Sequence, residues 1–589
     1  FQMQKKQLLF FYFLLSSIIS IFAQLSTTHY IPPIIADNGE IGEQFIYIST
    51  PSTVDVSFSV KTIGDPTNDY NGIVSKNTPF LYRIVDTGED PGDAGATLDT
   101  DGDSQLAIPE ILSNTVITDR GYIIEASDVV YVSVRFRSNN TFQAGAIVSK
   151  GLAALGKEFR AGGMAQENAI INKISGFLTY VSVMATEDNT TVVFDDFSPG
   201  IDIINYTGGA TPININLDEG ESYLIAVSVD KGGIPNDLIG TRITSDKPIV
   251  VNSGSGTGSF ADGDDGRDFG IDQIVGSDKI GNEYIFVKGN GGNGIGNKWE
   301  NVLIIANTNN TDVFINDAAT PSYNLANAGD WVVIEGDEYS IDGNMYVQTN
   351  EDVFVYQGIG GKPNQTPNQG MFFVPPLSCE NKGIVDNIAS IDKIGNADFD
   401  GDVSIVTKVG ATITINGTLI TNLSTPITIE GPSPVSGNTD YVTYKVTDLS
   451  GNVSIKSVDV TGVQVELYCA YFNANNFATS GSFYSGFPSP PEINLGVGLG
   501  AIGFCIPDLI LETINADSFD TLEWFYNSGS GTPTAITPGV EGNILLNGDL
   551  NPILPGNYFL RGTTCSGNFF DSQIIPVSFC PDDMDNDLI

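Results

Sequence analysis

The chain has 589 residues, of which 71 are Asp or Glu and 26 are Lys or Arg, giving a formal net charge of −45. So acidic a surface repels nucleic acid and anionic membranes, which excludes both as expected partners. The aromatic and β-branched content excludes a disordered chain. With 65 glycines and a low charge density, it favours an all-β protein of roughly four domains.

Residues 1–23 have the features of a secretory signal peptide. Lys5 and Lys6 form a positive start, an apolar stretch runs from Leu8 to Phe22, and Ala23 offers a cleavage position. An apolar stretch of about fifteen residues is short for a membrane span. We therefore expect an exported mature chain, secreted or at the cell surface, with no membrane insertion.

Three phrases recur in one order along the chain, which predicts internal duplication. The first phrase, an Ile or Leu followed by Gly, recurs at intervals of 114, 125 and 114 residues: Ile41, Leu155, Ile280 and Ile394. The third phrase opens at Gly121, Gly240 and Gly343 and, in a weaker form, at Gly451. The predicted β units are 24–150, 151–275, 276–390 and 391–475.

The second phrase is a polar turn between β-branched runs. DNTTVVFDD at residues 188–196 returns as NNTDVFIND at 309–317 and, in phase, as GATITING at 410–417. Asn and Thr favour tight turns, and β-branched residues favour the flanking strands. We predict turns at Asn189 and Asn310, with core-facing side chains on the strands that follow: Val192, Phe194, Val313 and Ile315.

Each unit is predicted to hold five to seven antiparallel strands. A brief helix is expected only within residues 149–163, and residues 242–254 are predicted to form a hairpin with Pro248 at a strand start. We predict sandwich-like units in a tandem array, with a propeller-like closed ring as the alternative. Gly-rich inserts at residues 253–270 and 289–297 should be loops at one end.

The sequence pattern changes after the fourth unit. Residues 476–500 are rich in Pro, Gly and Ser and are predicted to be a linker. Residues 501–580 show an immunoglobulin-like order of Cys505, Trp524, Tyr558 and Cys565, which predicts an immunoglobulin-like sandwich. Residues 581–589 are similar to the start of an acidic calcium-type repeat.

The five cysteines suit an exported, oxidised protein. Cys379 and Cys469 bracket the fourth unit, so we predict that they pair. Cys505 and Cys565 form the second predicted pair, which leaves Cys580 for a partner elsewhere.

Calcium is the cofactor that the sequence favours, because alternating acids suit a hard cation with oxygen ligands. The first candidate site has the spacing of an EF-hand loop, without its glycine: Asp99, Asp101, Asp103 and Glu110. The second candidate site comprises Asp398, Asp400 and Asp402. A further acidic run supplies Asp262, Asp264, Asp265 and Asp268. The alternative for each run is a solvated loop.

No catalytic constellation is recognisable. The single histidine, His29, is expected in an extended N-terminal arm, where it cannot serve a Ser-His-Asp or Cys-His site. The sequence lacks the His residues and clustered Cys residues that a zinc site needs, and the Gly-rich insert at residues 289–297 lacks the Lys of a phosphate-binding loop. Glycan cleavage by a carboxylate pair remains a minor alternative.

Several phrases between Ile41 and Phe472 resemble the IgGFc-binding protein N-terminal domain family. They include ALGKEFRAGG from Ala154, ATEDNTTVVF from Ala185, KIGNEYIFVKG from Lys279 and MFFVPPLSCEN from Met371. The chain is most similar to bacterial members of Bacteroidota type, large surface proteins that usually end in a type IX secretion sorting domain. The resemblance implies an extracellular binding role with an unspecified ligand, and it brings no catalytic residues.

These observations predict a secreted or cell-surface, adhesin-like binding protein, not an enzyme, whose ligand is an extracellular protein or glycan. The first alternative is a structural stalk that holds another domain away from the cell. The second is the exported glycan-cleaving enzyme. A binding function requires that the inserted loops gather on one face, which a stalk does not require.

Overall fold

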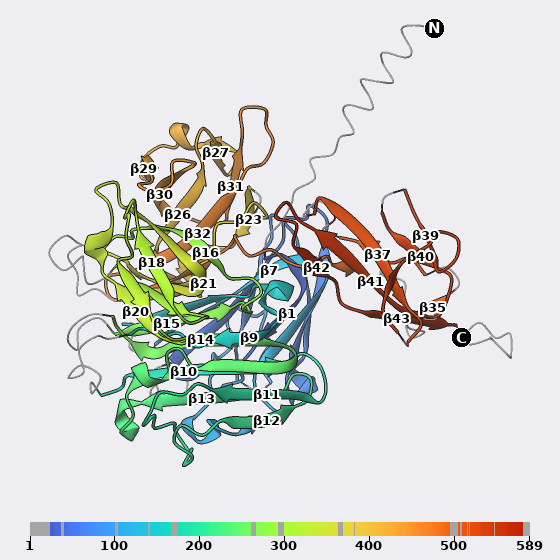
Figure 1. Cartoon of the computed structure of the whole chain (residues 1–589), viewed down its shortest axis with the longest axis horizontal. Helices are drawn as coiled ribbons and strands as arrows, with labels where there is room; N and C mark the ends of the chain where they lie inside the picture. Colours follow the sequence, from blue (N-terminus) through green and yellow to red (C-terminus); the bar gives the residue numbers. More distant parts are fainter. Residues whose placement is uncertain are drawn as a thin grey trace, which may run out of the picture.

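The computed structural model describes residues 24–36, 41–86, 88–99, 104–138, 142–165, 175–260, 267–291, 300–362, 369–381, 383–494, 505–506, 509–514, 516, 519–529, 531–546 and 548–580. The described residues form an all-β protein, as predicted, and their helical structure is confined to short 3-10 turns. One turn, η3 (Gly151–Ala154), confirms the brief helix expected within residues 149–163. Figure 1 shows a body of packed β units with a C-terminal module beside it.

The first three units are each organised around one strand of 17 residues. These long strands are β7 (Tyr122–Ser138), β14 (Arg242–Gly258) and β21 (Asn344–Gly360). In every unit, the first half of the long strand pairs with the first and third strands, and the second half pairs with the second and last strands. The shared topology confirms the internal duplication, and the third recurring phrase coincides with the long strand.

The other strands keep the same order in the three units. The first unit has β1 (Ser26–Ile31), β2 (Ile41–Ser49), β3 (Val56–Thr62), β4 (Tyr70–Val74), β5 (Phe80–Arg83) and β8 (Ala144–Val148); β6 (Val116–Ile117) joins the second unit's sheet. The second unit has β9 (Gly156–Arg160), β10 (Leu178–Ala185), β11 (Thr190–Asp195), β12 (Ile213–Leu217), β13 (Ser222–Ser228) and β15 (Asp268–Ile274). The third unit has β16 (Gly281–Val287), β17 (Val302–Ala306), β18 (Thr311–Ile315), β19 (Tyr323–Leu325), β20 (Trp331–Ile334) and β22 (Gln369–Phe373).

The fourth unit has the same plan, but its long strand is interrupted. β31 (Val453–Val458) pairs with β23 (Ile384–Ile388) and β27 (Thr412–Ile415), whereas β32 (Leu467–Ala474) pairs with β26 (Asp400–Lys408) and β33 (Thr479–Phe483). β31 and β32 are thus the two halves of a long strand. The unit also has β24 (Lys393–Ile394), β25 (Ala397–Asp398), β28 (Thr418–Leu419), β29 (Thr428–Pro434) and β30 (Tyr441–Leu449).

The long strand doubles back, so each unit is a small sandwich, as predicted. In the third unit, Lys288 N donates to Gly343 O and Asn290 N donates to Gly360 O, both at 2.8 Å. The two ends of β21 therefore lie close together, although a straight strand of this length would span roughly 55 Å. The two halves of the strand belong to two facing sheets.

The predicted hairpin at residues 242–254 is wrong for this reason. Those residues form part of β14, a single strand whose register shifts between Thr244 and Ile249. Pro248 lies within this bend, where the strand exchanges partners and a missing N–H costs no ladder bond.

The four sandwiches close into a ring around their last strands. β8 contacts β15, β15 contacts β22, β22 contacts β33, and β33 contacts β8. The described residues therefore form sandwich units, as predicted, and these units are arranged in the closed ring that was the alternative to a tandem array. Because Asp268 accepts hydrogen bonds from Ala144 N and Thr479 N, three of these strands begin side by side. We call this end of the ring, defined by Ala144, Asp268, Gln369 and Thr479, the insert end, and the opposite end the bend end.

Arg135 on β7 holds the first unit against the fourth. Its guanidinium is fully buried and donates to the backbone oxygens of Ala389, Ser390 and Lys393 at 2.8, 2.7 and 3.1 Å. It also lies 4.9 Å from the centroid of the Tyr471 ring, on β32 of the fourth unit. The closure between the first and last units therefore depends on polar and cation–π contacts as well as on apolar packing.

The first recurring phrase is equivalent only in the two middle units. Leu155 and Ile280 immediately precede β9 and β16, the first strands of their units. Ile41 instead opens β2, a second strand, and Ile394 lies in the short β24. The predicted equivalence of all four residues is wrong, because a phrase so short recurs in an Ile/Gly-rich chain without marking one structural position.

The turn phrase is equivalent in the last three units. Asn189, Asn310 and Gly410 have φ of 55°, 60° and 80° at the step from the second strand to the third. Thr190 Oγ1 donates to Glu187 O at 2.6 Å, and Thr311 Oγ1 donates to Thr308 O at 3.0 Å. The predicted core residues are buried: Val192, Phe194, Val313 and Ile315. The phrase is turn chemistry, as predicted, and it leads the chain from one sheet of the sandwich to the other.

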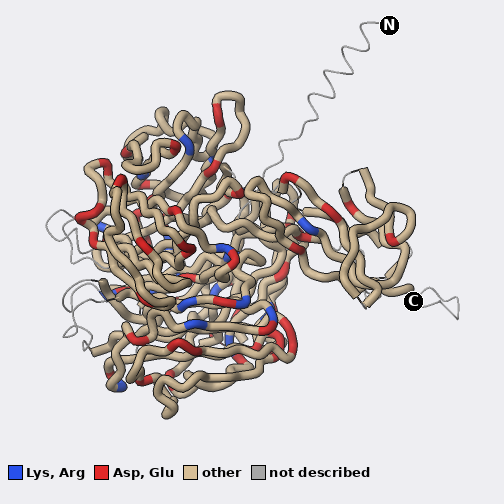
Figure 2. The backbone as a smooth tube through the Cα atoms, in the orientation of Figure 1, with Lys and Arg blue, Asp and Glu red and all other residues tan. Residues whose placement is uncertain are grey.

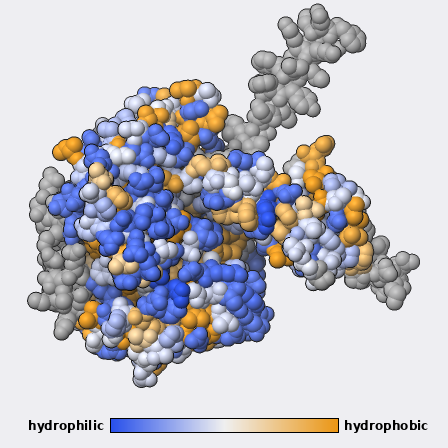
Figure 3. Space-filling view, viewed as in Figure 1, coloured by the Kyte–Doolittle hydropathy of each residue, from blue (hydrophilic) through white to orange (hydrophobic). Residues whose placement is uncertain are grey.

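The C-terminal module is a second all-β body. Trp524 on β37 (Thr521–Asn527) faces Leu560 on β41 (Gly556–Thr563), and both are buried. Tyr558 Oη donates to Leu554 O at 2.7 Å, as in the tyrosine corner of immunoglobulin-like domains. The remaining strands are β34 (Ile493–Asn494), β35 (Cys505–Ile506), β36 (Glu512–Thr513), β38 (Thr534–Ala535), β39 (Gly542–Ile544), β40 (Leu550–Pro552), β42 (Phe569–Asp571) and β43 (Ile575–Phe579). Figure 3 shows hydrophobic residues on the surface of this module. Its exposed residues include Ile544 and Leu546.

The predicted linker at residues 476–500 belongs in part to the ring. Residues 479–483 form β33, and Phe487 is fully buried with its ring stacked on Phe373 at 5.7 Å. Its Pro and Gly content reflects turns inside a packed body rather than a linker.

Both predicted disulfide pairings are wrong. Cys379 pairs with Cys565, Cys505 pairs with Cys580, and Cys469 is a buried free thiol on β32. The first bond joins the C-terminal module to the segment between β22 and β23. Glu380 supports this junction, because its carboxylate accepts from Thr564 Oγ1 and Ser566 Oγ, both at 2.6 Å. Chain proximity suggested a pair within the fourth unit, whereas Cys379 pairs with a cysteine of the C-terminal module; the second bond stays within that module but joins Cys505 to Cys580.

Val313→Asp should lower the free energy of unfolding by about 4 kcal/mol, because it places an unpaired charge in the core. Phe314→Asp, on the opposite face of β18, should cost only about 1 kcal/mol. Thr311→Ser keeps the turn hydroxyl and should leave stability and binding nearly unchanged. Denaturant unfolding measures the stability of all three variants. Equal losses of stability from Val313→Asp and Phe314→Asp would contradict the assignment of these two side chains to opposite faces of β18.

Peptide mapping of the exported protein without reduction should recover Cys379 joined to Cys565 and Cys505 joined to Cys580. Because Cys469 is fully buried, it should react with a thiol reagent only after denaturation. Recovery of a Cys379–Cys469 peptide would contradict the tether between ring and module.

Candidate functional site

Two aspartates of β15 hold the centre of the ring together. Asp268 Oδ1 accepts from Ala144 N at 2.6 Å, and its Oδ2 accepts from Thr479 N at 2.8 Å. Asp272 Oδ2 accepts from Phe373 N at 3.0 Å and from Ser482 Oγ at 2.9 Å. These side chains connect β15 to the other three last strands.

Lys150 completes this central network. Its ammonium lies 2.9 Å from Asp272 Oδ1 and donates to Val148 O at 3.1 Å, and both charged side chains are fully buried. Burial lowers the pKa of Lys150 and raises the pKa of Asp272, while their mutual contact opposes both shifts. Since all its polar atoms serve neighbouring strands, the network is structural rather than catalytic.

The chain connections that carry the inserts emerge at the insert end. The second strand of each unit begins beside the end of the long strand: Ile41 opposite Ser138, Leu178 opposite Thr257, Val302 opposite Gln357, and Asp400 opposite Ala474. The turn that precedes the last strand of each unit also lies at the insert end. Residues 253–258 and 268–270, which we predicted to be loop, are instead the ends of β14 and β15.

Glu300 anchors one of these inserts. It is fully buried, and its carboxylate accepts from the N–H groups of Gly289, Gly291 and Gly360 at 2.8, 2.9 and 3.0 Å. A Cβ at Gly291 would lie 2.8 Å from Glu300 Oε1, so this approach requires glycine. Burial raises the pKa of Glu300 to about 7, although the three donors oppose the shift.

An aromatic pair lies on the surface of the insert end. Phe142 and Phe477 pack edge to face, with centroids 4.7 Å apart and 48% and 46% of each residue exposed. The pair joins the turn before β8 to the turn before β33. Aromatic side chains, Phe among them, are enriched at protein–protein interfaces.

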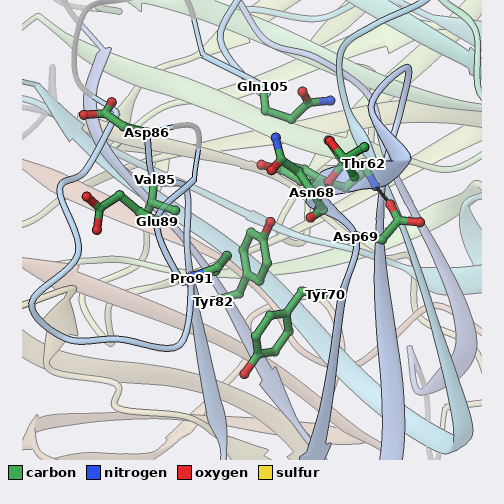
Figure 4. Close-up of a pocket in the computed structure, with 12 residues that line it drawn as sticks. Thr62, Asn68, Asp69, Tyr70, Tyr82, Val85, Asp86, Glu89, Pro91 and Gln105 are labelled. Carbon is green, nitrogen blue, oxygen red and sulfur yellow. Dashed lines mark hydrogen bonds between the residues drawn. The ribbon is translucent and has the colours of Figure 1, made fainter.

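A cavity of about 140 Å³ opens between the two sheets of the first unit. Tyr82 and Tyr122 line it; their rings pack edge to face at 5.6 Å, and Tyr82 hydrogen-bonds to Tyr122 and Thr62. Figure 4 shows Asp86 and Glu89 on one side of the cavity, with Thr62, Asn68 and Asp69 on the other. We call it the first-unit cavity.

A model of the IgGFc binding protein family matches residues 145–466, more than half of the chain. The chain belongs to the IgGFc-binding protein family. The resemblance predicted between Ile41 and Phe472 is therefore confirmed over the matched range. This range begins in β8, so the first-unit cavity lies outside it, as does the C-terminal module.

Membership of the IgGFc-binding protein family identifies the chain with binding proteins. A search of curated proteins found no match. Solved structures with some similarity include an anti-sigma factor domain-containing protein from Clostridium clariflavum, at 10% identity and a TM-score of 0.10, covering 73% of this chain and 97% of that one. Another is trypsin-activated alpha-2-macroglobulin from Escherichia coli, at 9% identity and a TM-score of 0.13, covering 96% of this chain and 49% of that one. Scores so low carry no argument about fold.

The second predicted calcium site is held by protein partners. Asp398 pairs with Lys393, and Asp400 pairs with Lys362. Asp402 is buried and accepts from Asn290 Nδ2 at 2.7 Å and from Asp448 N at 3.0 Å, and burial raises its pKa to about 7. Within the described ranges, no three His, Cys, Asp or Glu side chains form a group that could hold a metal ion.

The first predicted calcium site lies partly outside the described residues, which exclude Asp101 and Asp103. Glu110 pairs with Lys231 at 2.8 Å. Asp99 lies near the first-unit cavity: burial raises the pKa of Tyr122 well above its usual value, and the charge of Asp99 adds to that rise. Asp262, Asp264, Asp265 and residues 581–589 also lie outside the described part of the chain. Calcium binding therefore stays a prediction.

His29 is a buried residue of β1, not part of an extended arm. Its Nε2 lies 3.0 Å from Val130 O, and its Nδ1 lies 3.0 Å from Ser149 Oγ. Burial lowers its pKa from 6.5 to about 4. The prediction failed because the partners of β1 lie about a hundred residues along the chain.

His29→Gln should change how stability depends on pH. The unfolded chain binds a proton at His29 below about pH 6.5, and the folded chain binds it only near pH 4, so protonation favours unfolding in this interval. From pH 7 to pH 4 the wild type should lose about 3 kcal/mol relative to the variant. Urea unfolding at several pH values measures this difference, and parallel curves would contradict the neutral, buried imidazole.

No helix in the described part of the chain is long and apolar enough to cross a bilayer. Figure 2 shows Asp and Glu spread over every unit, with far fewer Lys and Arg. Two disulfides fit an oxidising compartment.

Proposed function

We propose that this protein is an exported, adhesin-like binding protein that takes an extracellular protein or glycan at the insert end of its ring. The observation that carries the proposal is that the equivalent connections of all four units converge on one end, and that those of the second and third units carry the Gly-rich inserts. A stalk has no need of this arrangement. The family's binding role supports the same conclusion.

The C-terminal module leaves the insert end clear. Its tether, Cys379, lies between the end of β22 and the start of β23, and both strand ends are at the bend end. Figure 1 shows the module at the side of the ring. A ligand can therefore approach the insert end without meeting the module.

The test is a screen of the full chain on a glycan array and on extracellular proteins, immunoglobulin among them. For a ligand so found, Phe142→Ser with Phe477→Ser should weaken binding at least tenfold without lowering the melting temperature by more than a few degrees, because an aromatic anchor is lost. Val54→Ser with Val409→Ser is the matched control, since both valines are exposed at the bend end. Failure of every probe, or equal losses from the two double variants, would favour the stalk.

A further inference from the structure

The first-unit cavity is separate from the ring's centre and from the family-matched residues. It lies where the outer strands β3, β4 and β5 meet the start of β7, and Thr62 faces Tyr122 across the β3–β7 pair. The central network does not involve these residues. We propose that this cavity binds a cationic group, the ammonium or guanidinium of a basic side chain or of a free amine.

The first argument is that two lining amides already use N–H groups within the fold and keep their oxygens as acceptors. Gln105 Nε2 donates to Ile63 O at 3.1 Å and to Gly121 O at 3.0 Å, which leaves its amide oxygen. Asn68 Nδ2 donates to Asp65 Oδ2 at 2.8 Å and likewise leaves an oxygen. A ligand that supplies several N–H donors satisfies such a surface, as ammonium and guanidinium groups do.

The second argument is charge. Asp69, Asp86 and Glu89 line the cavity, and neither Lys nor Arg is among its described lining residues. Asp69 uses one carboxylate oxygen to accept from Thr62 N at 2.7 Å, while Asp86 and Glu89 accept no side-chain hydrogen bond from any described residue. The negative rim attracts a cation, and the formal net charge of −45 favours its approach.

The third argument is the aromatic wall. The rings of Tyr70 and Tyr82 lie 5.9 Å apart, and Tyr82 packs against Tyr122. Burial raises the pKa of all three hydroxyls, so the rings are neutral phenols at physiological pH. The faces of such rings attract cations and accept the apolar stem of a basic side chain.

Size favours a side chain over a sugar. An engineered protein cavity of about 150 Å³ holds benzene, which has six heavy atoms. A cavity of about 140 Å³ therefore admits the last atoms of a lysine or arginine side chain. A hexose, with about twelve heavy atoms, would fill more than this volume.

The test is titration of the full chain with n-butylammonium and n-butylguanidinium, followed by calorimetry or ligand-observed NMR, with n-butanol as the neutral control of equal length. The cations should bind, more weakly at 200 mM than at 20 mM salt, and n-butanol should not. Nα-acetyl-lysine methylamide and putrescine distinguish a protein side chain from a free diamine.

Asp86→Asn with Glu89→Gln should weaken n-butylammonium binding about tenfold, because two rim charges are removed. Asp55→Asn with Glu125→Gln removes the same charge elsewhere on the first unit and should have little effect. Tyr70→Leu should weaken binding through loss of the ring face. Binding of n-butanol or glucose as tight as that of the cation would overturn the proposal. So would an Asp86/Glu89 double variant that binds like the wild type.

Discussion

The fold depends on hydrogen-bond acceptors for the backbone N–H groups of four strand edges that face the ring axis. The last strand of each unit pairs on one side with the long strand and turns its other edge toward the axis, where its N–H groups need acceptors. Asp268 and Asp272 supply them to Ala144, Thr479 and Phe373. Lys150 then neutralises Asp272, because an unpaired buried carboxylate would cost several kcal/mol. The buried polar network of Asp268, Asp272 and Lys150 thus fixes the positions of the four units relative to one another along the ring axis, rather than adding much stability.

The ring is closed by different contacts at each seam, although the units share one plan. Between the last and first units, the buried Arg135 donates to three backbone oxygens of the fourth unit. Between the third and fourth units, Asn344 Nδ2 donates to Pro434 O and Thr443 Oγ1, both at 2.9 Å. Because these two seams have different polar pairs, the units beside them cannot exchange places without leaving buried donors unsatisfied.

This frame separates two surfaces that recognition can use. At the insert end, rigid strands and the buried Glu300 hold the bases of inserts from several units close together, so a ligand there would meet segments distant in sequence. The first-unit cavity is built between two sheets of one unit and needs no neighbour. A protein ligand with an exposed basic side chain suits an acidic surface of this kind, and charge would act mainly on its rate of association.

The sequence predicts the local structures of this chain, but it does not predict which distant strands and cysteines pair. Alternating β-branched residues and Asn/Thr turns determined the all-β class, the turns at Asn189 and Asn310, and the faces of Val313 and Ile315, because these depend on residues a few positions apart. The doubling back of the long strand, the closure of the ring and the burial of His29 were decided by the tertiary structure.

The disulfides show the same limit: Cys379 and Cys565 are separated by 186 residues, and nothing near either one specifies the other. The acidic runs illustrate it for the candidate site, since Asp268 and Asp402 look solvated in sequence and are buried acceptors in the fold. Which polar groups remain available to a ligand depends on the strands that the fold brings beside them, and those strands come from other units.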